Sequence, residues 1–93
     1  MTPEPSTPDS GGPPAGWAIV ENRLRRDLEF SDFAEAFAFM TRVAEIAEEM
    51  DHHPDWSNSW NQVTIELWSH DKGAITARDV DLARRINAVV DSA

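Results

Sequence analysis

The residues of this 93-residue chain best suited to chemistry are its three histidines, and all of them lie in one segment. His52 and His53 are adjacent, and His70 follows after a stretch rich in strand-forming residues. Imidazole is the side chain whose pKa lies nearest neutrality, so a group of imidazoles can donate and accept protons at cellular pH. Pro54 holds the corner after His53 in an extended shape, and Glu48 lies one helical turn before His52. These residue types at this spacing predict a site for proton transfer.

Other kinds of chemistry fit the sequence less well. Three histidines and a carboxylate can hold zinc, but adjacent histidines rarely ligate one ion because their rings point apart, and the helical spacing His-x-x-x-His is absent. The chain has no cysteine, so it has no thiolate nucleophile and no disulfide. No serine lies in a nucleophile-elbow sequence, and no glycine-rich loop resembles a phosphate-binding motif. A metal site and an ordinary surface loop with two histidines stay open as alternatives.

The overall charge argues against several classes of partner. Seventeen acidic and eight basic residues give a net charge of −9, which repels phosphate backbones and anionic lipid. The first residues lack the basic flank and apolar core of a signal peptide, and no run approaches the ~20 apolar residues needed to span a bilayer. We therefore expect a cytoplasmic protein with no direct nucleic-acid partner and no membrane partner.

The chain is predicted to consist of a tail and one domain. Residues 2–16 contain five of the six prolines and three of the four glycines, and they offer little apolar surface to bury. We expect residues 1–15 to be a disordered tail and residues 16–93 to form a single domain. A domain of this size has a small core, so association with further copies would add stability.

Two strands and a helix are predicted in the first part of the domain. Residues 17–20 are a short apolar run rich in strand formers, and apolar and charged residues alternate over residues 23–30. Asn22 between them can take the left-handed conformation of a tight turn, so a β-hairpin over residues 17–30 is expected. At Ser31 or Asp32, either of which can cap a helix, the apolar spacing changes to three and four. The predicted helix ends near Asp51, because the proline that follows prevents its continuation. Its inner face is expected to consist of Phe33, Ala36, Phe37, Met40, Val43, Ala44, Ala47 and Met50.

The second part of the domain is predicted to return to the sheet and to end in a helix. Val63, Ile65 and Leu67 alternate with polar neighbours in a half-buried strand, and residues 56–60 form either its start or a separate strand. Thr76 caps a last helix after a turn at residues 70–73. This order of elements predicts an α+β fold in which helices pack on one face of an antiparallel four-stranded sheet. The inner face of the last helix is expected to consist of Val80, Ala83, Ile86, Asn87 and Val90, with Leu82 and Val89 at its margin.

A spaced pattern carries a resemblance to a known family. The pattern is Glu48-x-x-x-His52-His53-Pro54, followed by Trp60, His70 and Asp79. It resembles the signature of the pterin-4a-carbinolamine dehydratases, and the resemblance extends from residue 16 to the C-terminus. The family removes water from a 4a-hydroxy-tetrahydropterin left by aromatic amino acid hydroxylases, and the quinonoid dihydropterin that forms is then recycled to tetrahydrobiopterin. The resemblance implies a hydro-lyase that needs no metal and no organic cofactor.

The resemblance also implies roles for individual residues. His53 matches the histidine placed to protonate the leaving hydroxyl, whereas His52 and His70 match histidines that assist proton removal and hold the pterin. Asp79 matches an acidic position that orients a histidine, but its place also fits a helix cap, and both alternatives stay open. Trp60 is expected in the core or in the wall of the pocket. Support of the site or contact with substrate is further expected from Glu48, Asp51, Pro54, Ser69 and Trp56, the last as a stacking wall.

The resemblance has consequences for assembly as well. Family members usually begin with a helix before the first strand, whereas this chain has a segment rich in proline, glycine and serine there. The family forms dimers by joining sheets edge to edge and often forms tetramers, so a homodimer is expected and a tetramer is left open. Relatives also act as transcriptional coactivators or Rubisco assembly factors. A non-catalytic binding protein with a protein partner is therefore the alternative function.

Overall fold

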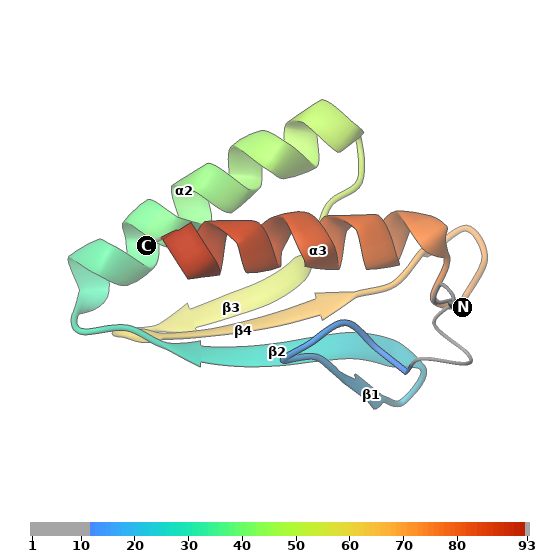
Figure 1. The fold of residues 1–93 in the computed structure, drawn as a ribbon, viewed down its shortest axis with the longest axis horizontal. Helices are drawn as coiled ribbons and strands as arrows, with labels where there is room; N and C mark the ends of the chain where they lie inside the picture. Colours follow the sequence, from blue (N-terminus) through green and yellow to red (C-terminus); the bar gives the residue numbers. More distant parts are fainter. Residues whose placement is uncertain (1–11, 93) are drawn as a thin grey trace, which may run out of the picture.

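The fold is a four-stranded antiparallel sheet with two helices on one face (Figure 1). The structure, a computed structural model, describes residues 12–92. The strands lie side by side in the order β1-β2-β4-β3, and each pair of neighbours is antiparallel. The predicted α+β class and the four-stranded sheet are confirmed. The elements are β1 (Ala18–Val20), β2 (Arg23–Glu29), α2 (Phe33–Met50), β3 (Asp55–Ser59), β4 (Gln62–Leu67) and α3 (Ala77–Ser92).

Two-residue turns connect both pairs of sequential strands. Glu21 and Asn22 join β1 to β2 with φ angles of 51° and 65°. A tight hairpin turn needs two left-handed residues so that its twist matches that of the strands. The sequence predicted this conformation for Asn22. Trp60 and Asn61 join β3 to β4, and Trp60 has a φ angle of 52°. The turns fix which residues face one another across each hairpin.

Glu21→Asn is expected to raise the free energy of unfolding by about 0.5 kcal/mol. Glutamate is disfavoured at a positive φ, whereas asparagine is enriched at this position of tight hairpins. Equilibrium unfolding in urea measures the change. The control is the same substitution at Glu45, which is exposed in the middle of α2. Glu45→Asn should lower the free energy of unfolding, because asparagine is a poorer helix former than glutamate. A stability gain at Glu45 with none at Glu21 would contradict this explanation.

The core lies between the sheet and the helices. Val63, Ile65 and Leu67 on β4 are fully buried and alternate with half-buried polar residues, as the sequence predicted. Helix α3 faces them with Leu82 and Val89, which the sequence placed at the margin of its inner face but which are buried. The removal of apolar surface from water is the main contribution that holds these layers together. Among residues 12–92, no helix combines the length and apolarity that crossing a membrane requires.

Helix α2 begins and ends where the sequence predicts. The carboxylate of Asp32 accepts the N–H of Glu35 at 2.8 Å and so caps the first turn. At the other end Asp51 takes the left-handed conformation, with a φ of 53°. The N–H of His52 then bonds back to the carbonyl of Ala47 at 3.0 Å, which closes the helix and starts the loop to β3.

The buried face of α2 differs from the predicted one. Phe39, which the prediction left out, is buried, and its ring centroid lies 5.0 Å from that of Phe30. Phe33 and Phe37, which the prediction placed inside, are exposed and stack on each other at 5.7 Å, and Ala44 is exposed as well. Apolar residues occupy a wider arc of this helix than the sheet and α3 cover. Spacing alone therefore did not fix which part of the arc faces inward.

The start of the described chain is attached to α3 through one asparagine. The side-chain oxygen of Asn87 accepts a hydrogen bond from Nε1 of the buried Trp17 at 2.8 Å and another from Arg26. Its amide nitrogen donates to the carbonyl of Ala15 at 2.9 Å. Gly16 has a φ of 85°, a conformation that favours glycine, and a Cβ there would also displace the guanidinium of Arg26, whose Cζ would lie 2.8 Å away.

The predicted tail falls largely outside the described residues. Its first eleven positions, residues 1–11, lie outside them. Residues 12–15 are described and contain neither helix nor strand.

Candidate active site

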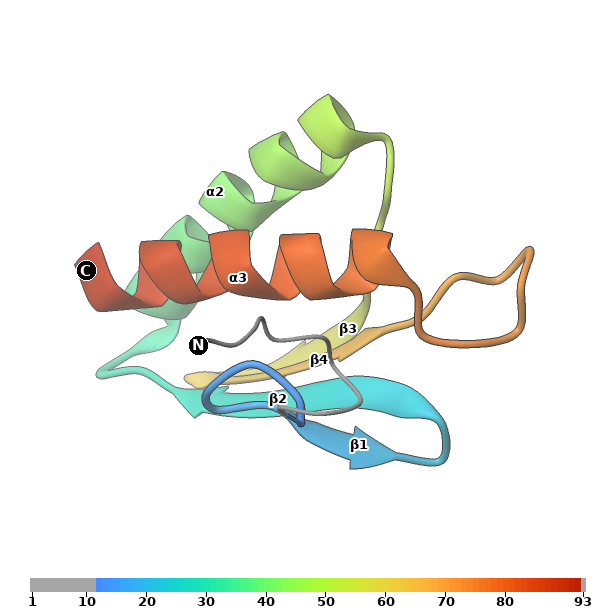
Figure 2. The ribbon, with the colours of Figure 1, turned by 45° about the vertical axis from the view of Figure 1, so that its right-hand side comes forward.

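The three histidines lie on two loops at the same end of the sheet. His52 and His53 lie between α2 and β3, whereas His70 lies in the loop that connects β4 to α3. Because β3 and β4 are antiparallel neighbours, the start of one strand lies beside the end of the other. Figure 2 shows the loop after β4 extending beyond the first turn of α3. The fold thus brings together side chains that are distant in the sequence.

His52 is buried and contacts a carboxylate that is itself buried. Its Nε2 lies 2.6 Å from Oδ1 of Asp79, whose side chain is 0% exposed. Oδ2 of Asp79 accepts the hydroxyl of Ser69 at 2.9 Å and the backbone N–H of Thr76 at 2.8 Å. Because Thr76 directly precedes α3, Asp79 caps this helix and holds His52 at the same time. The two alternatives for Asp79, helix cap and histidine partner, are both present in its contacts.

His53 forms a similar pair at the surface. Its Nε2 lies 2.6 Å from Oε2 of Glu48, and the two side chains are 55% and 78% exposed. Glu48 belongs to the last turn of α2, so the end of the helix supplies the carboxylate to the loop that follows. Exposed ion pairs contribute little to stability, so this pair is not needed to hold the fold.

His70 is paired with a carboxylate from the first residue of β3. Its Nε2 lies 2.9 Å from Oδ2 of Asp55, and the same oxygen accepts the indole Nε1–H of Trp68 at 2.6 Å. The rings of Trp68 and His70 lie against each other with centroids 4.1 Å apart. Arg23 packs over the Trp68 ring with its Cζ 4.5 Å from the centroid.

The same histidine nitrogen faces the carboxylate in all three pairs. That nitrogen is Nε2 in His52, His53 and His70. An ionised carboxylate only accepts hydrogen bonds, so opposite such a group the geometry favours the tautomer with the proton on Nε2. Nδ1 is then the nitrogen that can take up a proton from a bound molecule or return one.

A cavity of about 400 Å³ lies between the two loops. This volume is typical of sites for small molecules. Arg78 brings a positive charge to it and donates a hydrogen bond to the carbonyl of Asp51 at 3.2 Å. Within residues 12–92, no set of three or more histidine, cysteine, aspartate or glutamate side chains is arranged to hold a metal ion. The cavity is lined by Asp51, His52, His53, Trp68, His70, Asp71 and Arg78.

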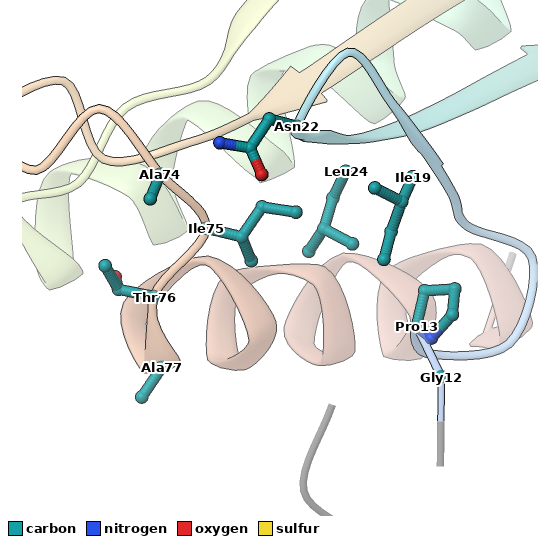
Figure 3. Close-up of a pocket in the computed structure, with 9 residues that line it drawn as sticks. All are labelled: Gly12, Pro13, Ile19, Asn22, Leu24, Ala74, Ile75, Thr76 and Ala77. Atoms are coloured by element: carbon teal, nitrogen blue, oxygen red, sulfur yellow. The ribbon is translucent and has the colours of Figure 1, made fainter. Parts of the chain in front are cut away.

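A larger cavity, of about 630 Å³, lies between the β1–β2 hairpin and the start of α3 (Figure 3). Its wall is largely apolar, with Ile19, Leu24 and Ile75 pointing into it, and no histidine or carboxylate of residues 12–92 lines it. The described part of the chain therefore supplies it with no group that exchanges protons near neutral pH. The smaller cavity, with its three histidines, is the candidate active site.

Several predicted residues lie outside the cavity wall. Glu48 and Asp79 each contact a histidine that lines the cavity, and Ser69 contacts Asp79. Trp56, predicted as a stacking wall, does not line the cavity and is partly buried against the hydrophobic core. Trp60, predicted in the core or the pocket wall, is 65% exposed, because it lies in the turn at the far end of β3. Pro54 is half-buried in the loop, between the histidine pair and β3.

The sequence interpretation missed four residues of this site. They are Asp55, which holds His70, and Trp68, Asp71 and Arg78, which line the cavity. The signal for Asp55 was present in the length of the β3–β4 turn. A two-residue turn at residues 60–61 pairs Asp55 with Glu66, which brings it next to the residues that follow β4.

One carboxylate on the open face of the sheet has a shifted pKa. The hydroxyl of Thr64 donates a hydrogen bond to Asp27 at 2.7 Å, and this contact, together with the nearby guanidinium of Arg25, lowers the pKa of Asp27. Asp27 and Thr64 are register partners across β2 and β4. The shift therefore reflects a cross-strand contact on the surface and is unrelated to the histidine cavity.

Fold and cavity together define the class of protein. It is an α+β domain whose candidate active site consists of three histidine–carboxylate pairs around a small-molecule cavity. Residues 7–89 match the model of the family described as Pterin 4 alpha carbinolamine dehydratase. The chain belongs to this family, and the resemblance seen in its sequence is confirmed.

Individual relatives agree with this assignment. A relative from Synechococcus sp. (strain WH7803), named for the same dehydratase, is 56% identical over 78% of each chain. One from Rhodopseudomonas palustris (strain BisB18) is 53% identical over 80% of this chain and 75% of its own length. A structure from Brucella melitensis, described as a transcriptional coactivator/pterin dehydratase, superimposes with a TM-score of 0.78 at 39% identity over 81% of this chain and 82% of that one. A pterin dehydratase-like Rubisco assembly factor of the α-carboxysome shares the fold, with a TM-score of 0.63 at 24% identity over 72% of this chain and 77% of that one.

Proposed function

We propose that this protein catalyses the dehydration of a 4a-hydroxy-tetrahydropterin to the quinonoid dihydropterin and water. The observation that carries the proposal is the arrangement of His52, His53 and His70 around one cavity, each with its Nε2 bonded to a carboxylate. Family membership supplies the substrate class. No metal and no organic cofactor takes part in the proposed reaction.

The reaction needs two proton transfers at neighbouring atoms. The bond between ring carbon C4a and its hydroxyl oxygen breaks, and the oxygen leaves as water after it has received a proton. The adjacent ring nitrogen N5 loses its proton, and the electron pair of that N–H bond forms the new C4a=N5 double bond. The overall change is loss of one water molecule, without oxidation or reduction.

Histidines suit both transfers because they exchange protons near neutral pH. We assign His53 as the acid that protonates the departing hydroxyl, as its match to the family pattern implies. Its side chain is 55% exposed, so it can regain a proton from solvent between turnovers. His52 and His70 assist removal of the N5 proton through Nδ1, because Nε2 of each is engaged by a carboxylate.

The test is a stopped-flow assay that follows loss of 4a-hydroxy-tetrahydropterin generated by an aromatic amino acid hydroxylase. The wild-type chain should accelerate the loss and yield quinonoid dihydropterin. The matched control replaces His52, His53 and His70 with alanine together, with folding checked by circular dichroism, and should leave the background rate.

A folded wild-type chain that leaves the background rate unchanged would refute the proposal. The binding role on the same fold would then become the leading explanation. An affinity pull-down that recovers one stoichiometric protein partner would support that role.

A further inference from the structure

We propose that Asp55 is a positioning residue for His70. The expected effect of Asp55 on turnover rests on the proposed function, whereas its expected effect on the orientation of His70 does not. Asp55 holds the imidazole in one orientation and in the tautomer with the proton on Nε2, which leaves Nδ1 to exchange protons in the cavity. It is not part of the spaced pattern Glu48-x-x-x-His52-His53-Pro54…His70…Asp79. The geometry that points to it is one oxygen, Oδ2, shared by His70 Nε2 at 2.9 Å and Trp68 Nε1 at 2.6 Å.

His70 depends on these contacts because little else restrains it. Its side chain is 61% exposed and lies on a loop. An exposed side chain on a loop samples several rotamers, and ordering one of them has an entropy cost. The carboxylate fixes the edge of the ring at Nε2, and the Trp68 ring, 4.1 Å away, restrains its face. Together the two contacts define one ring orientation.

The groups that hold His70 are themselves attached to the sheet. Asp55 is the first residue of β3 and pairs with Glu66 on β4. Glu66 accepts a hydrogen bond from Arg23 of β2 at 3.0 Å, and Arg23 packs over Trp68. Three neighbouring strands therefore support one exposed imidazole, and side chains on strands are positioned more firmly than side chains on loops.

Asp55 contributes little to the stability of the fold. Its side chain is 44% exposed, and an exposed ion pair has a small effect on the free energy of unfolding. Asp55→Ala should therefore remain folded, which allows its effect on His70 to be measured directly.

The first measurement does not depend on turnover. In the full chain labelled with ¹⁵N, the two ring nitrogens of neutral His70 should have the widely separated chemical shifts of a single tautomer protonated on Nε2. Asp55→Ala should reduce this separation and shift the indole N–H resonance of Trp68. Asp81→Ala, an exposed carboxylate on α3, is the matched control and should change neither resonance. An unchanged His70 spectrum in Asp55→Ala would overturn the proposal.

The second measurement is a double-mutant cycle in the dehydratase assay. Asp55→Ala should lower kcat about 10- to 100-fold with little change in KM, the range found when the carboxylate partner of a metal-bound histidine is removed. In the His70→Ala background the same substitution should cause no further loss, because Asp55 acts through His70. Equal losses in both backgrounds would refute the positioning role. If the wild-type chain shows no turnover, the proposed function fails, and the His70 spectrum alone decides the role of Asp55.

Discussion

Asp79→Ala is expected to lower the free energy of unfolding by about 3 kcal/mol, the largest effect of any single polar substitution in this site. The substitution removes the carboxylate that accepts from three buried or part-buried donors, on His52, Ser69 and Thr76. Water cannot replace it easily, because the Asp79 side chain is fully buried. Urea unfolding followed by tryptophan fluorescence measures the loss.

A matched control lies two residues further along the same helix. Asp81 is exposed, so Asp81→Ala should change the free energy of unfolding by no more than about 0.5 kcal/mol. Asp79→Asn should lower the free energy of unfolding by an amount between those for Asp79→Ala and Asp81→Ala, because an amide keeps one acceptor oxygen but loses the other. Equal effects of alanine at both positions would show that the network around Asp79 contributes nothing specific.

His53→Ala should have the largest effect on turnover, lowering kcat about 10²- to 10⁴-fold, the usual contribution of a group that transfers a proton in the transition state. Stability should hardly change, since His53 is exposed and its pair with Glu48 lies at the surface. Stopped-flow kinetics and urea unfolding on the same preparation separate the two effects.

The matched control for His53 is Lys72→Ala, an exposed polar side chain on the neighbouring loop. It should leave both turnover and stability close to wild type. Unchanged turnover in His53→Ala would remove this residue from the proposed acid role and shift attention to His52 and His70.

Much of the fold was predictable because local signals agreed with the tertiary structure. The alternation of Val63, Ile65 and Leu67 matches a strand with one buried face, and these side chains are buried. Asn22 was predicted in a tight turn and has a positive φ. The end of α2 near Asp51 followed from the proline after it, which disfavours helix at the preceding residue.

The errors have a common physical cause. Phe33 and Phe37 were placed inside because apolar spacing defines an arc of the helix, whereas packing against the sheet and α3 decides which part of that arc is buried. Asp55 was missed because its partner is close in space through the β3–β4 pairing and distant in the sequence. Local spacing identified the histidines, but it did not identify the groups that hold them.

The two-residue turn at Trp60–Asn61 has a consequence for engineering this protein. It lies at the end of the β3–β4 hairpin far from the histidines, yet its length determines that Asp55 faces Glu66. One inserted residue would slide the strands past each other, and side chains that now share a face would point to opposite faces. The turn is therefore a poor place for a peptide tag or a domain insertion.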